Sequence, residues 1–231
     1  MSECPNLSYL ASIPEVIAME KTGSHAAPKH AVGNDQEYHR EGVACFFTEQ
    51  ALREGALRAF EGALKVAKAG GLMQSFERLG CTWASASYAM NTQVFRNEWG
   101  WTGNIVTDAA PLRGSSNGFK GYKNHALEVL AAGSEQFCLD GSAGHGKEAL
   151  AWAKEHNDGN IVELLINAAI SWEYAIAHSN IVNGISSADK IVQVTPWWKT
   201  ALVSVIVVLS VLTAAALALS VVSTVLKKKE A

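Results

Sequence analysis

The fold is decided by one stretch of sequence, Arg96-Asn97-Glu98-Trp99-Gly100-Trp101-Thr102-Gly103-Asn104-Ile105-Val106-Thr107-Asp108. Its first part closes a helical pattern that begins at Tyr88, and Gly100 is the residue type that ends helices. Its second part, from Asn104 to Asp108, has an apolar, β-branched centre preceded by glycine and therefore predicts a strand. Catalytic groups in parallel α/β folds follow the carboxyl ends of strands, so Asp108 is a candidate site residue. The alternative is an aspartate that caps the next helix or turns the loop.

Short apolar runs alternate with helical patterns on both sides of this stretch, which is typical of βα units around a parallel sheet. The further strands that we expect are 25–29, which is a weak candidate, 72–76 and 136–139. The further helices that we expect are 48–68, 122–132, 147–156 and 160–178. Together these make about four βα units, half the number of an eight-stranded barrel. The sequence therefore predicts an α/β fold, a partial (β/α)8 TIM-type barrel over residues 1–182.

The end of the chain has the composition of a membrane span. An apolar run without charge extends from Ala201 to Leu226, and about 20 apolar residues are enough to cross a bilayer as a helix. We expect a linker over 183–199, a transmembrane helix over 200–226 and a short basic tail over 227–231. The alternative is a buried core helix, which is disfavoured because the run has no polar face.

The residues that flank this span predict its orientation. Trp197 and Trp198 suit the headgroup level on one side, and three lysines, Lys227 to Lys229, follow on the other. Because lysine-rich flanks stay in the cytoplasm, we expect a cytoplasmic C-terminus and an extracytoplasmic domain over residues 1–195. The first twelve residues lack the pattern of a secretory signal. We therefore expect that a segment upstream of Met1 is missing.

Composition excludes some classes of function. The 231 residues carry a formal net charge of −3, and no basic stripe predicts a nucleic-acid partner. The four cysteines have neither metal-ligand spacing nor the pattern of a disulfide framework. We expect no cofactor and no metal.

Four further residues could join Asp108 in a site. Lys29 and His30 follow the weak strand candidate, and both side chains can donate hydrogen bonds to sugar hydroxyls; the alternative is an ordinary loop with local ion pairs. Met73 and Phe76 lie on the 72–76 strand. Most such residues belong to the core, whereas an aromatic face could also form the wall of a sugar site.

These residues carry a resemblance to the barrel domain of glycoside hydrolase family 3, of the β-glucosidase type. The resemblance extends over roughly residues 2–184 and rests on four motifs in the same order and at compatible spacing. The motifs are Pro28-Lys29-His30-Ala31-Val32-Gly33-Asn34-Asp35-Gln36-Glu37-Tyr38-His39-Arg40, Thr48-Glu49-Gln50-Ala51-Leu52-Arg53-Glu54, Met73-Gln74-Ser75-Phe76, and the stretch that ends at Asp108.

The resemblance implies a role for each candidate. Asp108 matches the catalytic nucleophile, Lys29 and His30 would bind hydroxyls of the sugar in the first subsite, and Met73 and Phe76 would line that pocket. The chain would supply the C-terminal portion of the barrel, about its last four βα units. The missing half of the barrel carries another aspartate and an arginine that hold sugar hydroxyls.

The general acid is not assigned by the resemblance. In the family it usually comes from a separate α/β sandwich domain, which precedes the barrel in some relatives. The acids available on this chain are Glu77, which stands where the family has asparagine, Glu135 and Asp140. None of them occupies a family acid position.

Three hypotheses of function follow. The first is a retaining, β-glucosidase-like glycoside hydrolase that acts on β-glycosides, as a fragment of a membrane-anchored enzyme that is weakly active or inactive alone. The second is a non-catalytic, membrane-tethered sugar-binding remnant of the same family. The third is a membrane interaction module, which explains none of the four motifs. For the first, the expected partners are the membrane, the missing barrel half and an acid-supplying sandwich domain.

Overall fold

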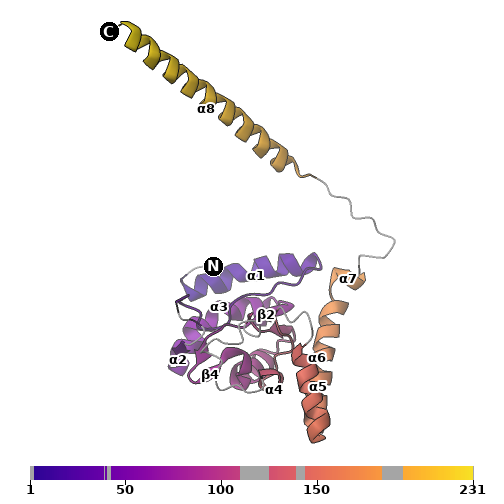
Figure 1. The fold of residues 1–231 in the computed structure, drawn as a ribbon. Coiled ribbons are helices and arrows are strands. Elements are labelled where there is room, and N and C mark those ends of the chain that lie inside the picture. Colours follow the sequence, from indigo (N-terminus) through magenta and orange to yellow (C-terminus); the bar gives the residue numbers. More distant parts are fainter. Residues whose placement is uncertain are drawn as a thin grey trace. The chain divides into compact units, whose positions relative to one another are not determined.

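The structure, a computed structural model, describes residues 3–38, 40, 43–109, 125–138, 144–183 and 195–230. The chain forms two compact units, residues 1–186 and 187–231. Each unit is described here by itself. Figure 1 shows the helices and strands of both.

A parallel sheet forms the centre of the first unit. Strands β2, Gly71–Met73, and β5, Asn104–Val106, pair in parallel, with Leu72 opposite Ile105. Single bridges extend this pairing to a neighbour on each side, Ala31 to Gln74 and Val106 to Gln136. The four chain segments therefore lie side by side in the order of the sequence, as consecutive βα units require. The predicted α/β fold is confirmed.

The two outer segments are less regular than the sequence predicts. The chain at 26–31 runs along β2, since the amide of Gly71 donates to the carbonyl of Ala26 at 2.9 Å and the amide of Met73 to that of Pro28 at 3.1 Å. This pairing ends two residues beyond the expected 25–29 strand. Of the expected 136–139 strand, only the bridge at Gln136 is formed within the part of the chain that the structure describes, which stops at 138.

The helices that precede β2 and β5 lie close to the expected ranges. The 48–68 prediction corresponds to one helical run with wider π-type turns, and Thr48 caps it, because its Oγ1 accepts from the amide of Ala51 at 3.1 Å. The run consists of α2 (Glu49–Ala51), η1 (Leu52–Ala56), α3 (Arg58–Glu61) and η2 (Gly62–Val66). The helix before β5 is η4, Ala89–Glu98, also with π-type turns.

The core lies between these helices and the sheet. Leu64, Leu72, Phe95 and Ile105 are fully buried there. Trp101 joins them, and its Nε1 donates to the carbonyl of Ala69 at 2.6 Å. The glycine at 103 makes this possible, since a Cβ there would lie 2.4 Å from the Trp101 ring.

Helix α1, Pro5–Lys21, was not expected from the sequence. It packs on α3 and η2, where Arg58 stacks on the Tyr9 ring at 3.6 Å. Its buried residues are Ser8, Ser12 and Val16, a helical spacing of four occupied mostly by small polar side chains. A search for an apolar face does not detect such a pattern.

A second, smaller sheet and the C-terminal helices complete the first unit. The small sheet has the order β1–β3–β4, with β1 at Ala44–Cys45, β3 at Arg78–Leu79, β4 at Thr82–Trp83, and the short helix η3 at Ala84–Ala86 after it. The helices are α4 (His125–Ala131), α5 (Gly144–His156), α6 (Gly159–Ala177) and α7 (Asn180–Asn183). Residues 122–124 of the helix expected at 122–132 lie outside the described residues.

The second unit is one long helix, α8, Trp197–Glu230. Its segment Trp197–Ser220 contains an 18-residue stretch with a mean hydropathy of 2.7 and no buried part, and the segment is long and apolar enough to cross a membrane. The helix begins three residues before the expected 200–226 span, so the expected linker, 183–199, is shortened at that end. At its other end α7 includes Asn183, and residues 184–194 lie outside the described residues.

Candidate functional site

The structure brings His30 and Asp108 together at the carboxyl edge of the parallel sheet. Asp108 follows β5 by two residues, and His30 directly precedes the bridge residue Ala31. The Nε2 of His30 lies 3.3 Å from the Oδ2 of Asp108, and the two side chains are 19% and 12% exposed. The residues are 78 positions apart in the sequence, and the parallel pairing of their segments with β2 is what makes them neighbours.

The two oxygens of Asp108 have different surroundings. Oδ1 accepts a hydrogen bond from the amide of Ala109 at 2.7 Å, which orients the carboxylate. Oδ2 is buried and has no hydrogen-bond partner among the described residues, because the nearby imidazole is not aligned to donate to it. A carboxylate that is held at one oxygen and unpartnered at the other can present that oxygen to a substrate atom.

Two charged or titratable neighbours, Lys29 and Cys138, belong to the same electrostatic surroundings as this pair. Burial lowers the pKa of His30, and the positive charge of Lys29 lowers it further, while Asp108 opposes both. The ring is therefore neutral at pH 7 and has one N–H to donate. Lys29 is exposed. Burial and the charge of Asp108 raise the pKa of the Cys138 thiol, and Lys29 lowers it, which places all four groups in one electrostatic cluster.

Met73 and Phe76 differ in their accessibility. Met73 is half-buried at the end of β2. Phe76 is 1% exposed and packs with Trp83 and Val129 in a small core cluster. The guanidinium of Arg40 covers its ring at 4.4 Å. Phe76 thus occupies a core position here, and its expected role as a pocket wall stays a prediction that requires Arg40 to move aside.

Glu77 is a buried acid for which the sequence predicted no role. It follows Phe76 and is completely inaccessible to solvent. Burial raises its pKa to about 7. The side-chain amide of Asn34, with its nitrogen toward Glu77, donates to the two carboxylate oxygens at 2.6 and 3.1 Å. One feature of the sequence could have drawn attention to Glu77, because this acid stands at a position where the resembling family has asparagine.

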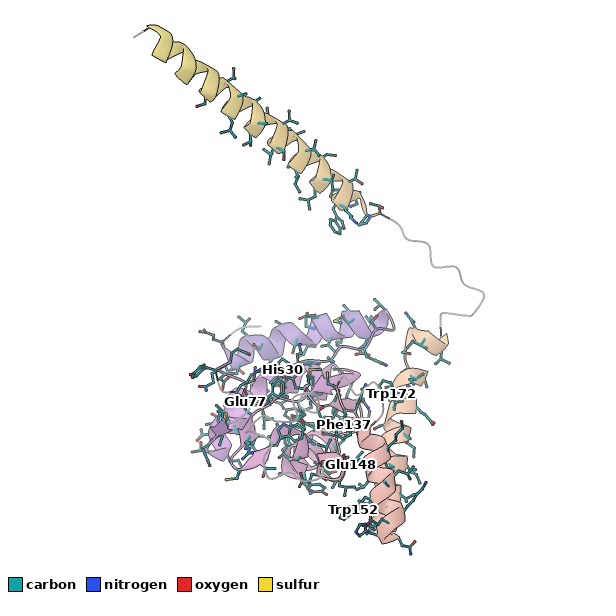
Figure 2. All side chains as sticks on the ribbon, in the orientation of Figure 1. His30, Glu77, Phe137, Glu148, Trp152 and Trp172 are labelled. Carbon is teal, nitrogen blue, oxygen red and sulfur yellow. The ribbon has the colours of Figure 1, made fainter. Side chains whose placement is uncertain are left out.

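The other acids considered lie elsewhere. Glu135 pairs with Arg96, accepts from the amide of Ile105 at 2.7 Å and is contacted by Ser171 at 3.3 Å. Glu135 therefore contacts the first residues of β5 and does not lie at the carboxyl edge of the sheet. Asp140 is outside the described residues. Figure 2 shows His30 and Glu77 in the part of the unit built around β2, away from the helices that carry Trp152 and Trp172.

The comparisons with known proteins agree on one family. Residues 4–144 match the family model described as the N-terminal domain of glycosyl hydrolase family 3. A β-glucosidase of Ruminococcus albus is 30% identical over 146 residues, which cover 62% of this chain and 15% of that protein. The probable β-glucosidase J of Neosartorya fischeri is 36% identical over 107 residues, 46% of this chain and 12% of that protein.

Solved structures show the same likeness in three dimensions. The β-glucosidase 3B of Thermotoga neapolitana, in complex with glycerol, superposes with a TM-score of 0.69 at 25% identity, over 82% of this chain and 26% of that one. A β-glucosidase of Paenibacillus barengoltzii gives 0.65 at 26% identity, over 83% and 20%. The chain thus spans about a quarter or less of the length of these relatives.

Proposed function

We propose that this chain, which belongs to glycosyl hydrolase family 3, presents the nucleophile of a retaining, β-glucosidase-like glycoside hydrolase at Asp108. The observation that carries the proposal is the Asp108–His30 pair at the carboxyl edge of the sheet, where Oδ2 has no hydrogen-bond partner among the residues that the structure describes. The neutral His30 and the exposed Lys29 would donate hydrogen bonds to hydroxyls of the sugar, and Met73 would contact its ring.

In this mechanism Oδ2 of Asp108 attacks the anomeric carbon. The bond from that carbon to the leaving oxygen breaks, its electron pair stays on the oxygen, and a general acid supplies the proton. Water then attacks the anomeric carbon of the glycosyl ester, gives a proton to the conjugate base of that general acid, and releases the sugar and the carboxylate. The first step requires a second carboxyl group about 5–5.5 Å from the nucleophile.

We propose that this second carboxyl comes from another part of the assembly. Glu135 forms an ion pair with Arg96 at the opposite edge of the sheet, and Glu77 is inaccessible to solvent. The four parallel segments would be about the last four βα units of the barrel, completed by a further barrel half and an α/β sandwich domain that carries the acid. The small share of the relatives' length that this chain spans supports this proposal.

An activated, slowly hydrolysed substrate tests the nucleophile separately from the acid. A 2,4-dinitrophenyl 2-deoxy-2-fluoro-β-glucoside has a leaving group that needs no protonation, so it should form a glycosyl ester on Asp108 in the full chain. Intact-protein mass and peptide mapping would detect this ester. Asp108→Asn should abolish labelling, whereas Asp158→Asn, which keeps the helix cap of α6 at Asn160, should label normally. Labelling at another carboxylate, or equal labelling of Asp108→Asn, would refute the assignment.

Ordinary aryl β-glucosides should be turned over slowly by the isolated chain. Loss of an acid catalyst commonly costs about 10²–10⁴-fold in rate. Hydrolysis of a substrate with a poor leaving group should therefore suffer more than hydrolysis of one with a good leaving group.

A non-catalytic sugar-binding remnant is the second candidate function. It is favoured by the acids that the structure describes near the sheet, because Glu135 pairs with Arg96 and Glu77 is inaccessible, so neither is placed to act as a general acid. Calorimetry with glucose separates the two functions, because a remnant binds glucose and fails to form the ester with the fluoroglucoside.

We also propose that α8 anchors the chain in a membrane, with the first unit extracytoplasmic and the C-terminus cytoplasmic. The unburied, apolar segment Trp197–Ser220, in which Lys199 near its start is the one charged residue, supports the span. The tryptophans before it and the lysines after it support the orientation.

A further inference from the structure

The buried carboxylate of Glu77 lies beside the segment that leads away from the site. After His30 the chain is tied to β2 and the residues that follow it, since the amide of Ser75 donates to the carbonyl of Ala31 at 2.7 Å and Ser75 Oγ to that of Val32 at 2.9 Å. Beyond Val32 the chain leaves the sheet as a loop, residues 33–38. Within the described part of this loop, the amide of Asn34 reaches both oxygens of Glu77.

This loop and its neighbour Arg40 act on the site. The positive charge of Arg40 lowers the pKa of His30, and the negative charge of Glu37 raises it. Arg40 also covers Phe76, the residue before Glu77, and contacts Glu37 at 3.3 Å. The position of the 33–38 loop therefore contributes to the charges around His30, beside those of Asp108 and Lys29.

Burying a carboxylate costs folding free energy, and this cost is offset only in part by its hydrogen bonds. Burial holds the pKa of Glu77 at about 7, with Arg40, Glu37 and the Cys45 thiol as its nearest titratable or charged neighbours. A neutral residue would fill this space at lower cost. The presence of an acid at this position is therefore not explained by the stability of the fold. It is explained by the loop that the carboxylate holds in place.

We propose that Asn34 and Glu77 form a buried amide–carboxylate latch that fixes the 33–38 loop beside His30, which makes Glu77 a positioning residue of the Asp108 site. The proposal deepens the proposed function, since the site that the latch positions is the glycoside site. The latch itself can be tested without substrate.

The experiment exchanges the two groups. Asn34→Ala removes the donor and leaves the buried acid in place. The double variant Asn34→Asp with Glu77→Gln is isosteric and only exchanges amide and carboxylate. The full chain in detergent is followed by histidine NMR, with His30 identified from the spectrum of His30→Gln, and by amide hydrogen exchange over residues 33–38. Asn97→Ala, which removes an exposed amide on η4 that bonds Gln93, is the matched control.

Asn34→Ala should raise the pKa of His30 toward its usual value of 6.5 and accelerate exchange in the loop by about tenfold or more, since a hydrogen bond to a charged group is lost. The double variant should restore both, and Asn97→Ala should change neither. An unchanged His30 titration and unchanged exchange in Asn34→Ala would overturn the latch, and so would a double variant that behaves like Asn34→Ala. Because both measurements need no turnover, an intact latch with an unlabelled Asp108 would refute only the proposed function.

Discussion

The candidate site consists of a few single residues, and the sequence predicts the position of some of them better than that of others. Asp108 is a candidate because its place after a strand has a general meaning in α/β folds and because it matches the nucleophile that the resemblance implies. Its proximity to His30 is observed, and its catalytic role stays a prediction. The core position of Phe76 was one of the two alternatives that its place on a strand allows. The surroundings of Glu77 were not predictable, because they depend on Asn34, which approaches from a loop 43 residues earlier. Strand periodicity predicts the face of the sheet on which a side chain lies. It does not predict which loop covers that side chain.

Glu77 should make the stability of the fold depend on pH. Its pKa is about 7 in the folded chain and about 4.5 when unfolded, so the folded state binds more protons between these values and stability falls as pH rises from 4.5 to 7. The decrease should be at most about 3 kcal/mol. Urea unfolding at pH 5 and pH 8 should show that Glu77→Gln loses this decrease, while Glu54→Gln, an exposed matched control on η1, keeps it. An equal decrease in Glu77→Gln would contradict the assignment.

Elements were predicted better than the contacts between them. The helix expected at 160–178 is present as α6, but its docking to the first half of the unit depends on His25, whose Nε2 donates to the carbonyl of Ala175 at 2.7 Å while Nδ1 faces Glu20 at 2.8 Å. Burial lowers the pKa of His25, but the contacts with the Ala175 carbonyl and Glu20 together raise it by more, so the net shift is upward. No local pattern indicates a partner 150 residues away.

The packing of α1 on η2 should tolerate no side chain at Gly62. A Cβ there would lie 2.3 Å from the carbonyl oxygen of Tyr9, whereas a Cβ at Gly55, in the same helical run, would meet nothing within 4 Å. We expect Gly62→Ala to destabilise the fold by about 1–3 kcal/mol through overpacking. Gly55→Ala should instead stabilise it by about 0.5–1 kcal/mol, because alanine favours a helix. Urea unfolding compares the two; equal effects would show that α1 does not pack as described.

At the scale of the whole molecule, the sequence predicts two parts with different solvents. The first buries its apolar residues around Leu72 and Ile105, and the second exposes Leu202, Val203 and their neighbours along α8. A helix that is apolar on all sides and unburied by the protein is suited to lipid, because its backbone groups are already paired within the helix; that lipid surrounds α8 stays a prediction. Periodicity separates these two parts well, because the signal is long and local.

Membrane anchoring by α8 should therefore depend on the depth of an added charge. Leu209 lies at the middle of the segment Trp197–Ser220, where arginine costs about 2.5–3.5 kcal/mol. The full chain should float with liposomes in a density gradient, and Leu209→Arg should shift it strongly toward the bottom fractions. Thr200→Arg adds the same charge near the end of the segment, where a long side chain reaches the headgroups, and should still float. Equal flotation of both variants, or a wild-type chain that stays at the bottom, would show that α8 is not held by lipid.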